Sequence, residues 1–303
     1  MVLFYMLYEI HSRENDIDVK LFDDFSLADT LKSGQTFRWK PYKDGFEGIV
    51  GNRICYISQK DDVVTFHDCT KKDFEDFWEG YFSFDTDYSQ IRKSLLYDAN
   101  VAKALEFCSG IHIMRQPLWE TTISFIISAN NNIPRISGII ERLSEKFGEK
   151  IQTSGGTYYA FPTPQSLSEA SIEDIHQCGA GYRDVYIKKT ALAFANGEFD
   201  QDKLYALPYK EAKKYIMTLY GVGAKVADCI LLFAAGKEEA FPVDIWVRKV
   251  VCGLYLGVDD AKSVPVSRIE KFAEEHFPRY RGYAQQVLFH YMRNYAEPVK
   301  REA

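Results

Sequence analysis

The residues of this chain that are best suited to chemistry are a lysine and an aspartate 19 residues apart. Lys225 comes just after a Gly221-Val-Gly223 turn, and Asp244 follows Pro242. A Gly-x-Gly turn before a helix exposes backbone N–H groups that bind phosphate. The positive end of a helix also favours the neutral form of a nearby amine, which is a nucleophile. An amine and a carboxylate beside a phosphate-binding turn predict chemistry at a sugar carbon of DNA.

Two helices must hold this turn in place. The apolar spacing predicts helices over residues 209–220 and 224–235, so that a helix-hairpin-helix spans about 209–236. Asp244 is expected to cap the next helix, over 244–255, and a cap without catalytic work is the alternative for it. Such a hairpin by itself more often binds DNA without reacting with it. Lys225 and Asp244 together favour an active site.

The rest of the chain predicts an α+β fold, with an antiparallel β module over residues 1–110 and a mostly helical body over 111–303. Short alternating runs separated by turns predict strands over 36–39, 46–50, 54–57 and 63–66, with helical segments at 26–32 and 71–81. Further helices are expected at 117–129, 133–147, 182–195, 266–276 and 281–296. The Gly- and Pro-containing stretch at 155–164 is expected to be a loop.

Composition indicates a folded protein of about two domains. The chain has 303 residues, of which 46% are hydrophobic and 15% aromatic, enough for a sizeable core. No apolar run approaches the roughly 18 residues of a membrane span, so no membrane association is expected. Residues 1–7 are apolar without a basic leader, and they are expected to form a strand rather than a secretory signal.

The charge distribution and the cysteine content indicate which binding partners and which cellular compartment to expect. The net charge is −6, but residues 1–110 carry 13 basic and 20 acidic side chains, whereas the remaining residues carry 24 and 23. A near-neutral helical body can present a local basic face to DNA, at the cost of weak long-range steering. The six cysteines are scattered without a C-x-x-C pair, which argues against a zinc or iron–sulfur site. We expect a reducing, cytoplasmic setting, associated with the nucleoid in a bacterium or nuclear in a eukaryote.

Several separate segments resemble one enzyme family. Residues 221–229 (GVGAKVADC) with Pro-Val-Asp244 resemble the helix-hairpin-helix DNA glycosylase superfamily, and the closer likeness is to 8-oxoguanine DNA glycosylase/AP lyases. The segments that support the closer likeness are 33–39 (SGQTFRW), 128–135 (SANNNIPR), 181–183 (GYR) and 284–289 (AQQVLF). The resemblance extends from about residue 20 to residue 295.

The resemblance implies roles for both reactive residues. Lys225 corresponds to the lysine that attacks C1′ of the damaged nucleotide, expels the base and forms a Schiff base that permits β-elimination. Asp244 corresponds to the aspartate whose carboxylate stabilises the oxocarbenium-like charge and orients the amine. Glycosylases that use water alone lack this lysine, so Lys225 implies a bifunctional enzyme. No cofactor and no catalytic metal are implied.

A base pocket is implied by residues on two predicted helices. Gln285 and Phe289 are four residues apart, as are Lys225 and Cys229, so each pair shares a helix face. The resemblance implies that Phe289 and Cys229 sandwich the flipped base while Gln285 bonds to its Watson–Crick edge. Without the resemblance, an ordinary core position is the more common role for Phe289 and Cys229.

Gly34 is implied to distinguish the lesion from guanine. N7 of guanine is an acceptor, whereas N7 of 8-oxoguanine carries a hydrogen and is a donor. A backbone carbonyl of Gly34 aimed at N7 would accept from the lesion and repel the normal base, and glycine permits that close approach. The alternative is a turn glycine without a recognition role.

The resemblance places four residues at the DNA around the extruded base. Asn130 would fill the gap, Tyr182 would wedge beside the estranged base, and Arg135 and Arg183 would bond to cytosine together with Asn130. Arginine donors match the acceptors of cytosine better than the donors of adenine, so both arginines imply cytosine opposite the lesion. For Arg135, a solvent-facing helix position is the alternative.

The chain departs from the family at Trp246, where a histidine two residues after the aspartate is common. A histidine contact to the lesion phosphate is therefore in doubt, and stacking or packing by Trp246 is the substitute. The hairpin is also expected to hold a structural cation through main-chain carbonyls near Met217, Leu219 and Val222. Gly221 and Gly223 remain the expected phosphate-binding positions.

The sequence thus predicts a base-excision repair enzyme that removes 8-oxoguanine from double-stranded DNA, acts as a monomer and nicks the abasic site. The nearest alternative is another glycosylase of the superfamily, acting on alkylated bases, oxidised pyrimidines or mispaired adenine. The missing iron–sulfur cysteines disfavour the endonuclease III-like and adenine-specific branches, and Lys225 disfavours the alkylated-base branch. A non-enzymatic helix-hairpin-helix DNA-binding protein is the alternative from a different class.

Overall fold

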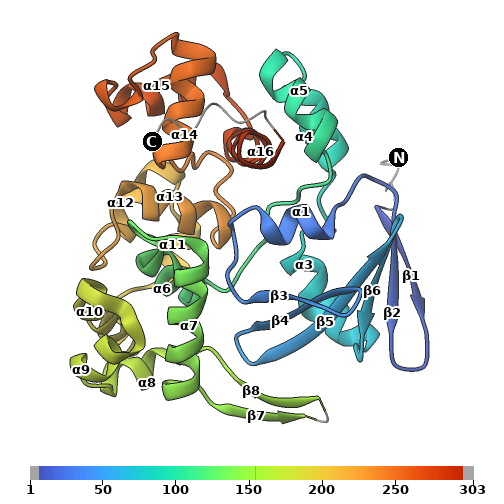
Figure 1. Ribbon diagram of the computed structural model, residues 1–303, viewed down its shortest axis with the longest axis vertical. Helices are drawn as coiled ribbons and strands as arrows, with labels where there is room; N and C mark the ends of the chain where they lie inside the picture. The colour runs from blue at the N-terminus through green and yellow to red at the C-terminus, as the bar shows by residue number, and fades with distance from the viewer. Residues whose placement is uncertain (1–6, 154, 296–303) are drawn as a thin grey trace. The chain divides into compact units, whose positions relative to one another are not determined.

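A computed structural model describes residues 7–153 and 155–295 of the chain (Figure 1). The chain forms two compact units, each assembled from separated segments. The first unit contains the segment that ends at Gln35, then Gln59–Met114, and then the segment that begins at Lys237. The second unit contains Thr36–Ser58 and Arg115–Gly236. The predicted division at residue 110 stays a prediction.

An antiparallel sheet dominates the N-terminal part, as the alternating runs predicted. Alternation is clearest in β2, where Ile17, Val19 and Leu21 are buried and the residues between them are partly exposed. Val19 pairs with the equally buried Val64 of β6. The strands follow the order β1-β2-β6-β5-β4-β3, and they are β1 (Tyr8–Ser12), β2 (Ile17–Leu21), β3 (Trp39–Tyr42), β4 (Gly45–Val50), β5 (Arg53–Lys60) and β6 (Val63–His67).

Five helices of the first unit, the two between residues 88 and 108 and the three between residues 245 and 294, pack around one apolar core. α16 lies against α5 and α14, and its residues from Arg281 to Leu288 are all buried. Aromatic and β-branched side chains such as Tyr283, Val287 and Phe277 fill this core. The helices of the whole unit are α1 (Leu27–Lys32), α2 (Lys71–Asp73), α3 (Glu79–Tyr81), α4 (Tyr88–Leu95), α5 (Ala99–Cys108), α14 (Ile245–Val251), α15 (Val266–His276) and α16 (Arg281–Asn294).

The second unit is mostly helical and contains the helix-hairpin-helix. α13 is buried from Val226 to Phe233 and packs against α6 and α12. The helices are α6 (Leu118–Ser128), α7 (Ile133–Phe147), α8 (Pro164–Glu169), α9 (Ile172–Ile175), α10 (Asp184–Ala195), α11 (Gln201–Ala206), α12 (Tyr209–Ile216) and α13 (Ala224–Phe233). A small hairpin of β7 (Lys150–Thr153) and β8 (Gly156–Tyr159) follows α7.

Some predicted elements were wrong at their edges. The strand predicted over 36–39 begins only at Trp39, because the carbonyl of Phe37 accepts a hydrogen bond from the Ser137 hydroxyl instead of pairing in the sheet. The loop predicted from residue 155 contains β8, whose Tyr158 donates to Glu47 at 2.8 Å. The strand predicted over residues 1–7 lies outside the described residues except for Leu7. No helix in 7–153 or 155–295 is long and apolar enough to span a membrane.

Candidate active site

The hairpin between α12 and α13 contains two glycines with different constraints. Gly221 has φ +80°, and a Cβ atom there would lie 2.8 Å from the Tyr186 side chain. Gly223 caps α13 and is exposed, and a Cβ atom there would meet no other atom within 4 Å. The fold therefore requires a glycine at 221, whereas at 223 the space beside the helix N-terminus is open, and phosphate binding there stays a prediction.

A buried ion pair joins the two helices of the hairpin. Asp228 on α13 is 1% exposed and accepts hydrogen bonds from Lys213 Nζ at 2.8 Å and from the Tyr209 hydroxyl at 2.7 Å, both on α12. A buried carboxylate is costly unless such donors surround it. The hairpin is also bonded to α10, because the Thr190 hydroxyl donates to the carbonyl of Tyr220 at 3.0 Å.

Lys225 lies in the first turn of α13, as predicted. Its Nζ is 3.3 Å from the Ser128 hydroxyl and 5.3 Å from the centre of the Phe125 ring. In the described part of the chain, no carboxylate forms an ion pair with this amine. A hydroxyl and an aromatic face hold the amine without the charge pairing that would occupy it, which suits a nucleophile.

Asp244 caps α14, which confirms its predicted position at a helix start. Its Oδ1 accepts a hydrogen bond from the backbone N–H of Val247 at 2.7 Å. Among the residues the structure describes, Oδ2 has no hydrogen-bond partner. Asp244 belongs to the first compact unit and Lys225 to the second, so their catalytic pairing stays a prediction.

Trp246 lies in the first turn of α14 with its side chain open to solvent. It is 52% exposed, and Lys249 Nζ lies 5.5 Å from its ring centre. The neighbouring Ile245 is exposed as well. A large aromatic surface beside a lysine is suited to contact with a nucleic acid, and a DNA contact of Trp246 stays a prediction.

α16 carries two of the four predicted pocket residues, Gln285 and Phe289, on one face. Gln285 is only 4% exposed, yet within residues 7–153 and 155–295 its Oε1 has no hydrogen-bond partner. A buried amide oxygen without a donor is costly, so a ligand that supplies one is favoured. Phe289 is the one partly exposed residue between Arg281 and His290, and the Arg293 guanidinium lies 5.9 Å from its ring.

The other two predicted pocket residues lie in separate elements. Gly34 follows α1 and has φ +83°, a conformation that residues with a Cβ rarely adopt. Cys229 is buried in α13, one turn after Lys225. Gly34 lies in the first unit and Cys229 in the second, so a joint pocket stays a prediction.

The residues predicted to contact the opposite strand lie in two loops of the second unit. Asn130 is exposed and has φ +52°, and Arg135 is exposed in the first turn of α7. Tyr182 is 58% exposed, and the guanidinium of Arg183 lies 4.4 Å from its ring centre. Arg183 itself is buried and donates to the carbonyls of Ala129, Asn130 and Ala180. In this structure Arg183 therefore shapes the loop that presents Asn130.

Two family models together match most of the chain. The N-terminal domain model of 8-oxoguanine DNA glycosylase matches residues 19–122. The model of the HhH-GPD superfamily of base excision DNA repair proteins matches residues 123–277. The chain belongs to the 8-oxoguanine DNA glycosylase family. The predicted family and the predicted α+β fold are thereby confirmed.

Relatives with curated names agree with this family. N-glycosylase/DNA lyase OGG1 of Arabidopsis thaliana is 31% identical over 88% of this chain and 77% of the relative. The probable N-glycosylase/DNA lyase of Methanothermobacter thermautotrophicus is 28% identical over 89% of this chain and 94% of the relative. The matches thus span more than three quarters of each chain rather than the hairpin alone.

Solved structures are similar over the same extent. The 8-oxoguanine glycosylase/lyase of Clostridium acetobutylicum, in complex with dsDNA containing cytosine opposite 8-oxoG, has a TM-score of 0.90 and 36% identity. That likeness covers 95% of this chain and 99% of the other. The 3-methyladenine DNA-glycosylase of Archaeoglobus fulgidus has a TM-score of 0.75 at 18% identity, which shows a shared fold.

In this member of the 8-oxoguanine glycosylase family, three polar residues near the site were not singled out from the sequence. Ser128 contacts the amine of Lys225, Gln35 follows Gly34, and Gln286 follows Gln285. All three occur in the segments that carry the family resemblance. Their partners are far away in the sequence, so periodicity does not reveal them.

The cation predicted at the hairpin stays a prediction. The carbonyl of Leu219 already accepts a hydrogen bond from the N–H of Val222 at 3.2 Å, which is compatible with a second, cation-directed lone pair. Within the described ranges, no group of three or more histidine, cysteine or acidic side chains could hold a metal ion. Any such cation would therefore depend on main-chain oxygens such as those of Met217 and Val222.

Proposed function

We propose that this chain excises 8-oxoguanine from duplex DNA, preferably opposite cytosine, and then cleaves the strand at the resulting abasic site. The observation that carries the proposal is the position of Lys225. Its amine lies in the first turn behind a Gly-x-Gly hairpin, and within the described residues it is bonded to a hydroxyl and to no carboxylate. The relatives named N-glycosylase/DNA lyase support the same activity.

The proposed reaction begins with a covalent step at the sugar. The Lys225 amine forms a bond to C1′ while the bond from C1′ to N9 breaks, and the electron pair leaves with the base, which takes up a proton. Loss of a proton from nitrogen and opening of the sugar ring give the Schiff base. Removal of a proton from C2′ then expels the 3′ phosphate by β-elimination. Asp244 would stabilise the positive charge that develops on the sugar.

Recognition would divide between two groups of residues. Gln285, Phe289, Cys229 and the Gly34 carbonyl would bind the flipped base. The exposed Asn130, Tyr182 and Arg135 would occupy the vacated space and contact cytosine, with Arg183 supporting their loop. Gly221 and Gly223 would place backbone N–H groups against a phosphate, and the exposed Trp246 would be a separate contact to DNA.

Borohydride trapping tests the lysine chemistry. Protein is incubated with a duplex containing 8-oxoguanine opposite cytosine, and borohydride reduces any Schiff base to a stable amine. We expect a covalent adduct with the wild-type protein and none with Lys225→Gln, because the amide cannot form the imine. Excision by the variant should fall by at least about 1,000-fold, which corresponds to about 4 kcal/mol of transition-state stabilisation.

Three controls make the trapping result specific. Lys214→Gln removes an exposed lysine of α12 outside the reaction centre, and it should retain the adduct. Duplexes with an alkylated base or a thymine glycol test the neighbouring branches of the superfamily. A wild-type protein that binds duplex DNA but never forms an adduct would instead support the DNA-binding alternative.

We further propose that the protein acts as a monomer on double-stranded DNA in a reducing compartment. All six cysteines are free and buried, so none is paired in a disulfide. Such cysteine usage is typical of cytoplasmic or nuclear proteins. Sedimentation of the free protein and of its DNA complex measures the oligomeric state, and a dimer of the free protein would contradict this part of the proposal.

A further inference from the structure

α16 presents a second pair of polar residues next to the pocket pair. Gln286 and His290 each follow a pocket residue, Gln285 or Phe289, so they lie about 100° further around the helix. Both are only 2% exposed. Buried polar side chains require hydrogen-bond partners, and the identity of these partners shows what the second face does.

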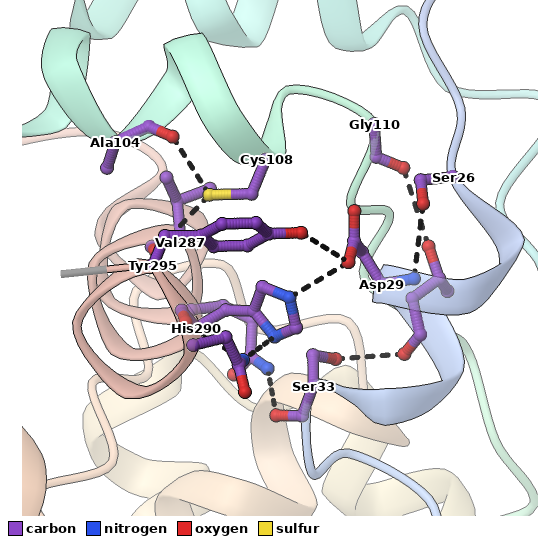
Figure 2. A network of polar contacts seen from close by, with 12 residues as sticks. Ser26, Asp29, Ser33, Ala104, Cys108, Gly110, Val287, His290 and Tyr295 are labelled. Carbon is purple, nitrogen blue, oxygen red and sulfur yellow. Dashed lines mark hydrogen bonds and ion pairs between the residues drawn. The ribbon is translucent and has the colours of Figure 1, made fainter. Parts of the chain in front are cut away.

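The partner of His290 lies on α1, as Figure 2 shows, and the partner of Gln286 is the residue that caps the C-terminus of α1. Gln286 Nε2 donates to the carbonyl oxygen of Ser33 at 2.7 Å. His290 Nε2 lies 3.1 Å from Asp29 Oδ1, which also accepts a hydrogen bond from the Tyr295 hydroxyl at 3.1 Å. Asp29 and Ser33 are four residues apart, so one face of α1 meets one face of α16.

The charge on Asp29 suits this junction. Burial by itself would raise the pKa of the Asp29 carboxyl, but hydrogen bonds from His290, Ser26 and Tyr295 outweigh it and hold that pKa below its usual value. The carboxylate is therefore ionised at neutral pH, when it accepts from several donors. The Ser26 hydroxyl also accepts from the N–H of Asp29 at 3.2 Å, which caps α1.

Gly34 follows Ser33, and the side chain of the next residue, Gln35, is held by hydrogen bonds. Gln35 is fully buried, and its Nε2 donates to the carbonyls of His112 at 2.8 Å and Thr30 at 3.1 Å. Its Oε1 accepts from the N–H of Met114 at 2.9 Å. Gly34 thus lies between two held groups. The Ser33 carbonyl before it is bonded to Gln286, and both amide atoms of the Gln35 side chain after it are bonded to the backbone.

Holding the residues on both sides of Gly34 matters because a glycine permits the adjacent peptide unit to flip. The Gly34 carbonyl and the Gln35 N–H belong to one planar unit, and a half-turn of that unit would exchange an acceptor for a donor. A donor aimed at N7 would bind guanine, whereas an acceptor binds the N7–H of 8-oxoguanine. The orientation of one peptide would therefore determine which base is preferred.

We propose that Gln286, assisted by the His290–Asp29 pair, is a positioning residue that holds the Gly34 peptide in its lesion-selecting orientation and couples it to the helix of Gln285. This inference rests on the proposed function, because it assumes that the Gly34 carbonyl meets N7 of the lesion. The two adjacent glutamines of α16 would then have different roles. Gln285 would touch the base, and Gln286 would orient the second group that touches it.

Substitution of Gln286 by methionine tests the proposal. Gln286→Met keeps the length of the side chain but removes the donor to Ser33. We expect single-turnover excision of 8-oxoguanine opposite cytosine to fall by about 10-fold to 100-fold, the range for a lost buried hydrogen bond. Cleavage at a preformed abasic site, which offers no base to recognise, should stay within about two-fold of the wild type.

Selectivity is measured separately from catalysis. In a Lys225→Gln background, the ratio of Kd values for duplexes with guanine and with 8-oxoguanine opposite cytosine reports base preference alone. Adding Gln286→Met should reduce this ratio by at least about five-fold, the lower end for one such bond. A merely structural role would weaken binding of both duplexes equally, and that result would overturn the proposal.

Gln59→Met is the matched control, because Gln59 holds the other end of the α1 region. Its Nε2 donates to the carbonyl of Phe25 and its Oε1 accepts from the N–H of Leu27, both at 2.7 Å. The control should lower the thermal midpoint to a similar extent without changing the ratio of excision to abasic-site cleavage. If it changes that ratio as much as Gln286→Met, general loosening of α1 is the cause and the proposal fails.

The design separates failure of this inference from failure of the proposed function. A wild-type protein without activity on 8-oxoguanine would remove the function itself. An active wild type with unchanged selectivity in Gln286→Met would remove only the positioning role. If Gln286→Met does not fold, Gln286→Asn replaces it. The shorter side chain keeps a buried amide but moves it away from Ser33 by one methylene. The proposal predicts the same reduced selectivity for this variant.

Discussion

The segments predicted to bind the lesion and those predicted to face the opposite strand are built in different ways. We call residues 33–35 with α16 the lesion segments, and residues 129–135 with 180–183 the opposite-strand loops. Gln35, Gln285 and Gln286 in the lesion segments are all buried. Asn130, Arg135 and Tyr182 in the opposite-strand loops are all exposed. The first region is buried, whereas the second presents exposed side chains on a backbone that Arg183 supports.

The difference is consistent with the two recognition problems. Guanine and 8-oxoguanine share the same Watson–Crick edge and differ only at N7 and C8, so distinguishing them requires groups that cannot rearrange. An opposite base and a widened helix vary in position, and exposed side chains can adapt to them at little cost in stability. Arg183 belongs to these loops but is buried, and its guanidinium donates hydrogen bonds to the carbonyls of residues 129, 130 and 180.

The largest expected effect comes from Gln285→Leu in the lesion segments. Excision of 8-oxoguanine should fall by about 100-fold, because hydrogen bonds to the Watson–Crick edge are lost. The free protein should be equally stable or more stable by up to about 1 kcal/mol, since an unpartnered buried oxygen is replaced by an apolar group. Single-turnover excision and calorimetry measure the two effects. A large loss of stability would mean that Gln285 is a structural core residue and not a recognition residue.

A smaller effect is expected from Arg135→Ala in the opposite-strand loops. Excision opposite cytosine should fall by about 10-fold relative to the other three opposite bases, the discrimination typical of one arginine contact to a base. Stability should change by less than about 0.5 kcal/mol because the side chain is exposed. The assay compares single-turnover rates opposite each of the four bases.

Arg183→Ala provides the contrast within the same loops. It should lower the free energy of unfolding by about 2 kcal/mol, because buried carbonyls lose their donors. If both arginine variants lose cytosine preference without any change in stability, the distinction between support and contact within these loops is incorrect.

The smallest effect is expected from Asp29→Asn, which removes a charge at the α1–α16 junction. Because the pKa of Asp29 is lowered on folding, its stabilisation is complete above the unfolded value of about 3.9 and is lost as the pH falls through the folded value. The variant should therefore be less stable than the wild type by about 1 kcal/mol at pH 7, and the difference should shrink below pH 4. Urea unfolding at pH 7, 4 and 3 gives the comparison. A constant difference at all three values would exclude the charge as its source.

Much of the fold could be predicted because it depends on local patterns. The 3.6-residue spacing located α12 and α13, and the proline before Asp244 located the start of α14. The strand at 36–39 failed because side chains from distant segments occupy that backbone, as Ser137 does at Phe37. β1 and β2 were not identified individually, although both lie within the antiparallel β module predicted over residues 1–110.

The site was predictable to the extent that its residues share a helix or a family motif. Lys225 and Asp244 lie at helix starts, where their positions follow from capping rules. Ser128 beside Lys225 and Gln286 beside Ser33 depend on contacts across 97 and 253 positions of the chain. Nothing in helical or strand periodicity encodes such pairs, so only a three-dimensional structure reveals them.

Folding constrains one of the two hairpin glycines, Gly221, but not the other, Gly223. At 221 the backbone conformation and the Tyr186 ring exclude any larger residue, so a variant there should be purged even in a cell with undamaged DNA. At 223 nothing in the protein opposes a side chain, so a screen for folding alone would accept alanine. Selection for thermal stability would therefore retain the first glycine but could lose the second, and with it the phosphate contact that we propose for Gly223.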